Sequence, residues 1–173
     1  HLPAIAHEIG MDFDITFANE ISAKTPNLCH LAPAGHTYME DLNEAGGVYA
    51  VMNQLKELGL LKEDCMTVTG KTIGEAVDGV KNRNPEVIRP LDNPIEDKGG
   101  IAVLYGNLAP KGAVIKRSAA SKHLLNHRGP AKVFESLEEC QKYLLDENSD
   151  VTADTVVVLR GFGPCGAPGM PEN

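Results

Sequence analysis

The sequence predicts a protein of the α/β class, with a helical first part and a strand-rich second part. Apolar residues recur every three or four positions through the first 60 residues, which indicates amphipathic helices. From residue 101 on, short β-type runs are bounded by Gly, Pro or Asn, which favours a barrel or a compact mixed sheet. Between the two parts, residues 81–99 carry three prolines and many turn formers, as a linker does.

The first 60 residues are expected to contain four helices. The pattern of "HLPAIAHEIG" (1–10) indicates a helix that is already formed at its first residue. The spacing of Phe13, Phe17 and Ile21 predicts a short helix after Asp14, and Pro26 prevents it from continuing. "HTYMEDLNEAGG" (36–47) and "VYAVMNQLKELG" (48–59) each place their apolar residues on one face. Gly46-Gly47 and Gly59 supply the stops, so we expect two helices joined by a Gly-Gly turn.

The segment "TGKT" (69–72) resembles the end of a phosphate-binding P-loop. That loop requires G-x-x-x-x-G-K-[ST], and the position of its first glycine is occupied here by Cys65. Without that glycine the phosphate cradle is incomplete. The sequence therefore favours a turn that leads into the short helix "TIGEAV" (72–77).

Four strands and one helix are expected in the second part. In "SLEECQKYLLDE" (136–147), Ser136 and Glu139 form an S-x-x-E capping box, and the apolar residues line one face. "YGNLAPKGAVIK" (105–116) predicts a hairpin, and Lys116 and Arg117 beside it suit an anionic ligand. The predicted strands are 101–105, 113–116, 131–134 and 155–159.

Charge and composition exclude several function classes. The net charge of −8 argues against nucleic acid and acidic membranes as partners, because both attract an excess of Lys and Arg. No apolar run approaches the ~20 residues that span a bilayer, and no signal peptide is visible. The four cysteines form no C-x-x-C pair, which favours reduced thiols in the cytoplasm over zinc ligands or a disulfide framework.

Two groups of His and Cys residues are candidates for a metal site. Cys29 and His30 are adjacent in sequence, which makes joint ligation awkward, so a buried Cys beside surface histidines is favoured. His123 and His127 would share a face on a helix, but they lack the glutamate of an H-E-x-x-H motif. Neither group predicts zinc.

The terminal segment "RGFGPCGAPGMPEN" (160–173) is the strongest candidate for a site. Its Gly and Pro residues shape a loop that directly follows a predicted strand. An acid after such a loop, Glu172, is the kind of ligand that Mg²⁺ prefers, although acids after loops are common. Because the chain begins within a helix and ends in its most constrained loop, we expect an internal segment of a longer protein.

Several segments together resemble the dihydroxy-acid dehydratase family, which includes sugar-acid and 6-phosphogluconate dehydratases. They occur in the order of the family and cover almost the whole chain. The segments are "HLPAIAHEIG", "APAGHTYMEDLNEAGGVYAVM", "TVTGKTIGEAV", "VIRPLDNPI", "GGIAVLYGNLAPKGAVIK", "HRGPAKVF" and "GPCGAPGMPE".

The resemblance implies a domain organisation. Residues 1–80 are expected to be the C-terminal part of the α/β cluster-binding domain, and residues 81–99 a linker. Residues 100–173 are expected to be the N-terminal part of a β-barrel-like (swivelling β/β/α) domain that is truncated here. The resemblance also implies a homodimer or homotetramer at full length.

The family reaction is the dehydration of a 2,3-dihydroxy acid to a 2-keto acid by a hydro-lyase. The implied cofactors are an iron–sulfur cluster (2Fe-2S or 4Fe-4S), whose Lewis-acid iron takes the 3-hydroxyl, and Mg²⁺, which holds the carboxylate and the 2-hydroxyl. A serine base removes the proton at carbon 2. Cluster cysteines are expected upstream of His1 and the serine downstream of Asn173, so the chain alone is expected to be inactive.

One functional residue carries over from the family, because Glu172 matches its magnesium-binding glutamate. The same resemblance implies that the loop residues line one wall of the active site. These residues are Gly163, Gly166, Gly169 and Met170. Cys165 stands where Lys is common, which is a departure that changes the local charge.

The substrate remains open between two dihydroxy acids. "MEDLNEAGG" and "TVTGKT" are similar to the enzyme of branched-chain amino-acid (valine, isoleucine) biosynthesis, which is the favoured substrate class. "KRSAASKHLLNHRGPAKVFE" and "DVTADTVVVLRGFGPCGAPGMPE" are closer to the sugar-acid (aldonate) dehydratases. An alternative of another class is a non-catalytic binding module or remnant.

Overall fold

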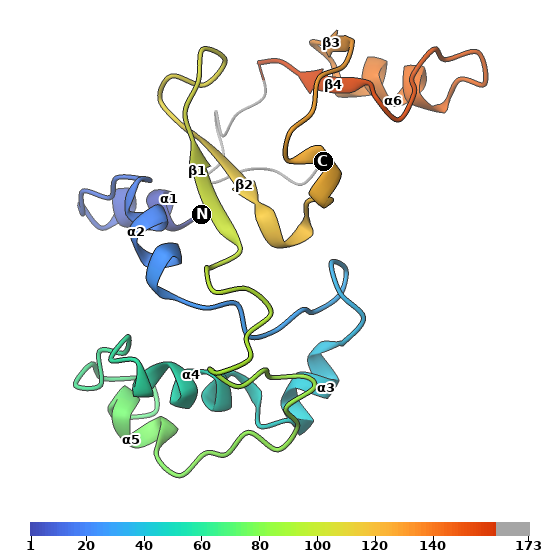
Figure 1. The fold of residues 1–173 in the computed structure, drawn as a ribbon. Helices are drawn as coiled ribbons and strands as arrows, with labels where there is room; N and C mark the ends of the chain where they lie inside the picture. Colours follow the sequence, from blue (N-terminus) through green and yellow to red (C-terminus); the bar gives the residue numbers. More distant parts are fainter. Residues whose placement is uncertain (162–173) are drawn as a thin grey trace. The chain divides into compact units, whose positions relative to one another are not determined.

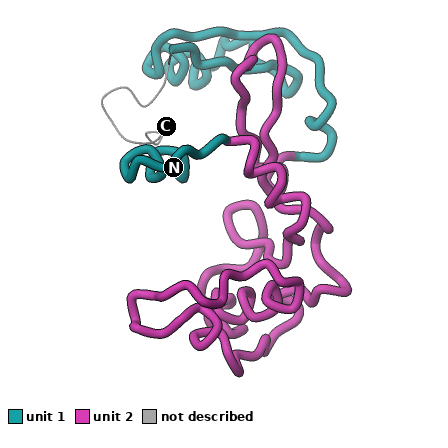
Figure 2. Tube along the Cα trace, turned by 90° about the vertical axis from the view of Figure 1, so that its left-hand side faces the viewer, with its two compact units in different colours: residues 1–14, 121–173 teal, residues 15–120 magenta. Residues whose placement is uncertain are grey.

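The computed structural model describes residues 1–161, and the chain divides into two compact units (Figures 1 and 2). One unit comprises residues 15–120. The other combines residues 1–14 with the chain from residue 121 on. Each unit is considered by itself below.

The unit of residues 15–120 begins with four helices, as the apolar patterns predict. They are α2 (Phe17–Lys24), α3 (Met39–Glu44), α4 (Gly47–Glu57) and α5 (Ile73–Val77). Helix α2 ends before Thr25, whose extended backbone is the conformation that Pro26 imposes on the preceding residue. Helix α4 starts at Gly47, one residue earlier than its apolar pattern.

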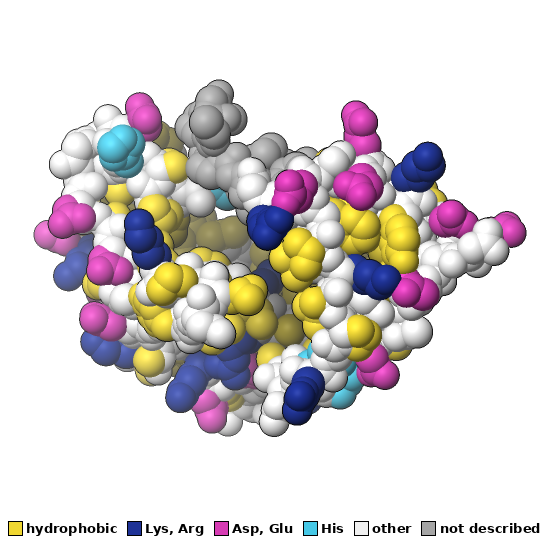
Figure 3. Space-filling model, turned by 90° about the horizontal axis from the view of Figure 1, so that it is seen from above, with side chains coloured by type: hydrophobic (Ala, Val, Ile, Leu, Met, Phe, Trp, Pro, Cys, Tyr) yellow, Lys and Arg dark blue, Asp and Glu magenta, His cyan; other side chains and the backbone are white. Residues whose placement is uncertain are grey.

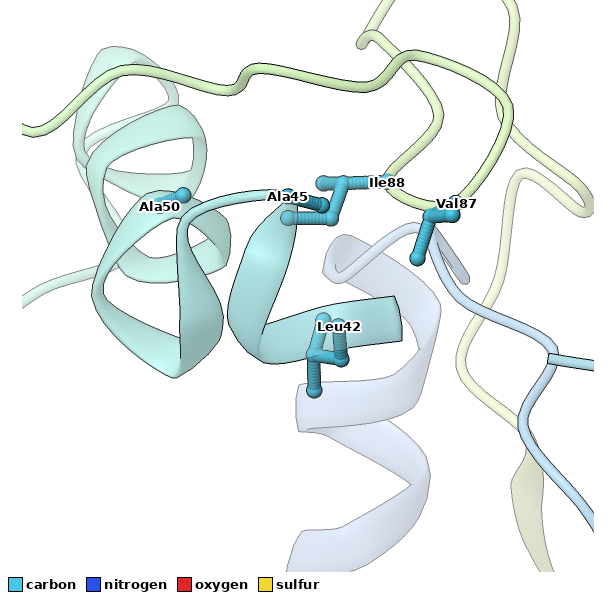
Figure 4. Close-up of a cluster of buried hydrophobic side chains, with 5 residues drawn as sticks. All are labelled: Leu42, Ala45, Ala50, Val87 and Ile88. Carbon is cyan, nitrogen blue, oxygen red and sulfur yellow. The ribbon is translucent and has the colours of Figure 1, made fainter. Parts of the chain in front are cut away.

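The hydrophobic core of this unit joins the α3–α4 pair to the segment that follows α5. Leu42, Ala45 and Ala50 come from the helices, whereas Val87 and Ile88 come from the proline-rich segment (Figure 4). The turn between α3 and α4 requires glycine, because Gly46 has φ +121° and a Cβ there would lie 2.6 Å from the Lys81 carbonyl oxygen. The Gly-Gly turn therefore brings residue 81 against the helices.

Strands β1 (Ile101–Leu104) and β2 (Ala113–Lys116) form the predicted hairpin. They pair antiparallel, with Val103 opposite Val114. Gly112 has φ +99°, and a Cβ there would come within 2.6 Å of Ile15 Cδ1, so the turn tolerates no side chain. The 3₁₀ turn η1 (Arg117–Ala119) follows.

The other unit is built around a strand–helix–strand element. It contains α1 (Leu2–Glu8), the 3₁₀ turn η2 (Lys122–Leu124), β3 (Ala131–Phe134), α6 (Leu137–Leu145) and β4 (Val156–Leu159). Strands β3 and β4 pair parallel, with Ala131 opposite Val156. Phe134 and Cys140 are buried. The Ser136 hydroxyl accepts a hydrogen bond from the Glu139 N–H, which is the N-cap half of the predicted capping box.

The α/β class is confirmed, but no closed barrel is present in residues 1–161. Their strands form two separate two-stranded sheets, one antiparallel and one parallel. Such small sheets depend on a helix packed against them, and α2 and α6 pack on β1 and β3 respectively. Among these residues no helix is long and apolar enough to cross a bilayer.

Candidate functional site

The residues singled out for the site lie outside the part of the chain that the structure describes. This holds for Glu172, for Cys165 and for the predicted loop wall of Gly163, Gly166, Gly169 and Met170. The structure does describe the element from which this segment starts. Strand β4 leads through Arg160 and Gly161 directly to it.

The parallel pairing of β3 and β4 fixes the backbone at the end of β4. The Val156 N–H donates to the Pro130 carbonyl at 2.9 Å, and the Arg160 N–H donates to the Phe134 carbonyl at 2.8 Å. The Arg160 guanidinium also pairs with the Glu135 carboxylate. Because both of these side chains are more than two-thirds exposed, the backbone ladder and not the ion pair provides the support.

A network of three side chains ties α6 and the loop after it to β3. Lys132 Nζ lies 2.7 Å from Asp150 Oδ2 and 5.4 Å from the centre of the Tyr143 ring, and the Tyr143 hydroxyl donates to Asp150. Hydrogen bonds from Lys132 and then from Tyr143 lower the pKa of Asp150, and the bond to Asp150 raises the pKa of Lys132. The network links β3, α6 and the loop after α6 at the surface, beside the buried side chains of Phe134 and Cys140.

The turn before β3 has one position that only glycine can occupy. A Cβ on Gly129 would collide with the Asp154 carbonyl oxygen, which the His127 Nε2–H contacts at 2.9 Å. His123 lies in the short η2 turn and His127 beyond it, so no helix places the two imidazoles on one face.

The described cysteines are not gathered at one place. Cys65 is exposed, Cys140 is buried, and Cys29 is only half-buried, although burial raises the pKa of its thiol. His30, beside Cys29, accepts a hydrogen bond on its carbonyl from Thr37 and is half-buried, whereas His36 is exposed. Within residues 1–161 no three His, Cys, Asp or Glu side chains converge as a metal site would require.

The "TGKT" segment is a closed turn, as the incomplete P-loop pattern predicts. The Thr67 N–H and hydroxyl both donate to the Lys71 carbonyl at 2.8 Å, and Gly70 adopts φ +77°. Helix α5 then begins with a full capping box between Thr72 and Glu75. Sequence reasoning missed this box, although its signal, T-x-x-E, is present in "TIGE".

Of the two cations beside the hairpin that suit an anionic ligand, Arg117 is already paired with a carboxylate. Arg117 lies 3.7 Å from the Glu96 carboxylate, and Lys116 is exposed at the end of β2. An open cavity of about 390 Å³ is lined by Arg117, Lys98, Glu96 and Asp97. Two acids face two bases there, so the cavity has no excess of positive charge to attract an anion.

Comparison with known proteins identifies the family. A family model described as "Dihydroxy-acid/6-phosphogluconate dehydratase N-terminal" matches residues 1–76, and the corresponding C-terminal model matches residues 86–173. Proteins named dihydroxy-acid dehydratase are similar over 99% of the chain. The identity is 61% for that of Agathobacter rectalis, 62% for that of Lachnospira eligens and 59% for that of Clostridium beijerinckii.

The chain covers only part of these relatives. It spans 30% of the Agathobacter and Lachnospira proteins and 31% of the Clostridium protein. Both family models nevertheless match, and together they account for residues 1–76 and 86–173. The chain therefore belongs to the dihydroxy-acid/6-phosphogluconate dehydratase family.

Proposed function

We propose that this chain is part of a hydro-lyase that dehydrates 2,3-dihydroxy carboxylic acids to 2-keto acids, as in valine and isoleucine biosynthesis. The observation that carries this proposal is the identity of 59–62%, over 99% of the chain, to proteins named dihydroxy-acid dehydratase. Identity at this level along the whole chain is what a shared reaction predicts. A sugar acid is the alternative substrate within the same family.

The reaction needs chemistry that a protein side chain supplies poorly. The proton leaves carbon 2, the hydroxyl leaves carbon 3, and the enol formed takes up a proton to become the 2-keto acid, so one water is lost overall. Hydroxide is a poor leaving group, and a Lewis-acid metal stabilises the charge that develops on it. An iron–sulfur cluster and Mg²⁺ are the proposed cofactors.

The residues described here do not form a binding site for either cofactor. Among residues 1–161 no three His, Cys, Asp or Glu side chains converge as metal ligands would. No ligand is therefore assigned within them. Glu172 stays the proposed magnesium ligand, with Gly163, Gly166, Gly169 and Met170 as the proposed wall of the substrate site, and β4 is the rigid strand that leads to both.

Three further features belong to the proposal. Residues 100–173 are proposed to contribute to a β-barrel-like domain, and the complete enzyme is proposed to be a homodimer or homotetramer in the cytoplasm. The proposed partner is a small-molecule substrate, and neither nucleic acid nor a membrane is proposed as a partner. The net charge of −8 argues against nucleic acid and acidic membranes as partners, and four cysteines without a C-x-x-C pair favour reduced thiols, as in the cytoplasm.

The test is a chimera of the Agathobacter rectalis dihydroxy-acid dehydratase in which this chain replaces the matching 172 residues. We expect the chimera to form a 2-keto acid from a branched 2,3-dihydroxy acid, at a rate within about tenfold of the unmodified relative. Circular dichroism and bound iron confirm that it is folded and loaded. A folded, loaded chimera that acts only on an aldonate would support the sugar-acid alternative, and one that acts on neither would overturn the proposed function.

A further inference from the structure

The hairpin of strands β1 and β2 has two outer edges, and they differ in their hydrogen bonds (Figure 1). At the edge of β1, the Asn19 amide nitrogen donates to the Val103 carbonyl at 3.0 Å, and its amide oxygen accepts from the Val103 N–H at 2.7 Å. These are the two bonds that a neighbouring strand would make with this residue. The edge of β1 is therefore capped by a side chain.

The register of the hairpin identifies the groups at the outer edge of β2. In an antiparallel pair, opposite residues direct their N–H and C=O groups either towards each other or away from each other. Val103 directs both groups to Asn19, so its opposite residue, Val114, directs its own groups away from β1. The same holds for Lys116, two residues further along β2 and opposite Ile101.

These outward groups of β2 are open to pairing. In the part of the chain that the structure describes, no hydrogen bond engages the backbone N–H or C=O of Val114 or of Lys116. Both residues are exposed. A row of backbone groups in this state is a template to which a further strand can be added.

The apolar face of the hairpin is covered on the β1 side only. Helix α2 packs on β1, and Val103 is 5% exposed. Val114, directly opposite on the same face, is 64% exposed. A two-stranded hairpin is marginally stable by itself, and a third strand with a hydrophobic face stabilises it. A strand added beside β2 would place its side chains next to Val114 and cover the part of the face that α2 leaves exposed.

We propose that β2 binds a further strand at Val114 and Lys116, and that this strand belongs to the same polypeptide in the full-length enzyme. The hairpin lies in the region that the C-terminal family model matches. The chain spans only 30% of the Agathobacter rectalis relative, so most of the polypeptide that could supply a strand lies outside it. In this arrangement the sheet continues from β2 only, and β1 is its end strand.

The inference rests on the proposed β-barrel-like domain and specifies the edge of the hairpin at which its sheet continues. It does not depend on the proposed reaction. A chimera that is folded by circular dichroism therefore tests it whether or not that chimera dehydrates a substrate, and the two proposals can fail separately.

Hydrogen exchange resolved to single amides, on the 173-residue chain and on the chimera described above, tests the proposal. The Val114 and Lys116 amides should exchange about 100-fold more slowly in the folded chimera than in the chain. The Val103 amide is the internal reference, because Asn19 accepts its hydrogen bond in both proteins. Equally fast exchange at Val114 and Lys116 in both proteins would overturn the proposal. Protection already present in the 173-residue chain would also overturn it, and a rise with chain concentration would identify a second copy as the partner.

Proline at position 114 provides a second test, because proline has no N–H and this N–H points away from β1. In the 173-residue chain, Val114→Pro should leave the hairpin paired, since the outer edge of an edge strand tolerates proline. In the chimera, Val114→Pro should make the Lys116 amide exchange about tenfold faster than Val114→Thr does. The threonine variant is the matched control, because it keeps the β-branched shape and the N–H. Equal Lys116 exchange in the two folded variants would refute the added strand.

Discussion

At the scale of single residues, asparagine side chains form hydrogen bonds with the chain that follows α5, both in the irregular segment before β1 and in β1 itself. Asn53 donates to the Val80 carbonyl at 2.9 Å, Asn82 donates to Ile88 at 2.7 Å, and Asn19 holds both polar groups of Val103. An amide both donates and accepts, so one side chain replaces the partner that a missing strand or helix would supply. The prolines restrict the backbone of this segment, and the asparagine side chains supply hydrogen bonds that fix its position.

Also at this scale, Glu172→Gln in the active chimera should raise the Mg²⁺ requirement and lower turnover. Altering the surroundings of a metal ligand typically costs ~10–100-fold in affinity or activity, and neutralising a ligand should cost at least as much. The measurement is initial rate against Mg²⁺ concentration, with cluster absorbance recorded in parallel. Glu147→Gln, an exposed carboxylate after α6, is the control. Unchanged rates at limiting Mg²⁺ would count against the assignment of Glu172.

At the scale of elements, the helix starts show how local chemistry positions the short helices. The Thr72 N–H donates to the Glu75 carboxylate at 2.8 Å, and the Glu75 N–H donates to the Thr72 hydroxyl at 3.2 Å. Hydrogen bonding from Thr72, first through its backbone N–H, lowers the pKa of Glu75. Helix α5 has only five residues, yet it brings Val77, which is fully buried, into the core. A helix this short depends on its cap and on that one contact.

Thr72→Ala should therefore lower the free energy of unfolding by about 1 kcal/mol, the usual cost of an N-cap hydroxyl. Thr72→Ser keeps the hydroxyl and should restore most of the loss. Urea unfolding monitored by circular dichroism provides the comparison. Equal stabilities of the alanine and serine variants would show that the cap contributes nothing.

The strand–helix–strand element predicts a dependence on pH. The folded-state pKa of Asp150 is lowered, so its stabilising contribution is complete above the ordinary aspartate pKa of about 3.9 and is lost as the pH falls through the lower folded value. Asp150→Asn should destabilise the chain near neutrality, and the difference from the unmodified chain should shrink in acid. Urea midpoints at pH 7, 4 and 3 measure this. A difference that stays constant down to pH 3, with Glu147→Gln as the charge control, would contradict it.

At the scale of the molecule, each unit has a small sheet covered by a helix on one side. Large apolar side chains remain exposed on the hairpin, among them Leu104, Leu108 and Val114 at 52%, 83% and 64%. Figure 3 shows hydrophobic side chains at the surface among acidic and basic ones. The cluster of buried hydrophobic residues in the unit 15–120 is correspondingly small. Hydrogen bonds from the backbone and from asparagine side chains therefore supply much of the contact between the segments of this unit.

The 173-residue chain alone should bind no iron–sulfur cluster. Cys29, Cys65 and Cys140 differ in exposure and do not converge with other ligands within residues 1–161. After anaerobic reconstitution with iron and sulfide, we expect no stoichiometric charge-transfer band in the visible spectrum. An apo-ferredoxin treated in parallel shows that the procedure works. A stoichiometric band in the chain would show that its own residues bind the cluster.

The sequence by itself determined the elements whose causes are local. The apolar spacing of 39–44 and 47–57, the short β-type runs of 113–116 and 131–134, and the cap at Ser136 all depend on neighbours within a few positions. The short helix predicted after Asp14 is also present, because α2 begins at Phe17 and ends at Lys24, before Pro26. The family resemblance, carried by quoted segments, was confirmed by both family models.

Only the tertiary structure decided which distant groups meet. Asn19 and Val103 are 84 positions apart, and the parallel pairing of Ala131 with Val156 could not be read from either strand. The same applies to Val87 and Ile88, whose place in the core is set by helices 40 residues away in the chain. Periodicity reports which face of an element is apolar, but the partner of that face is chosen by the packing of the whole unit.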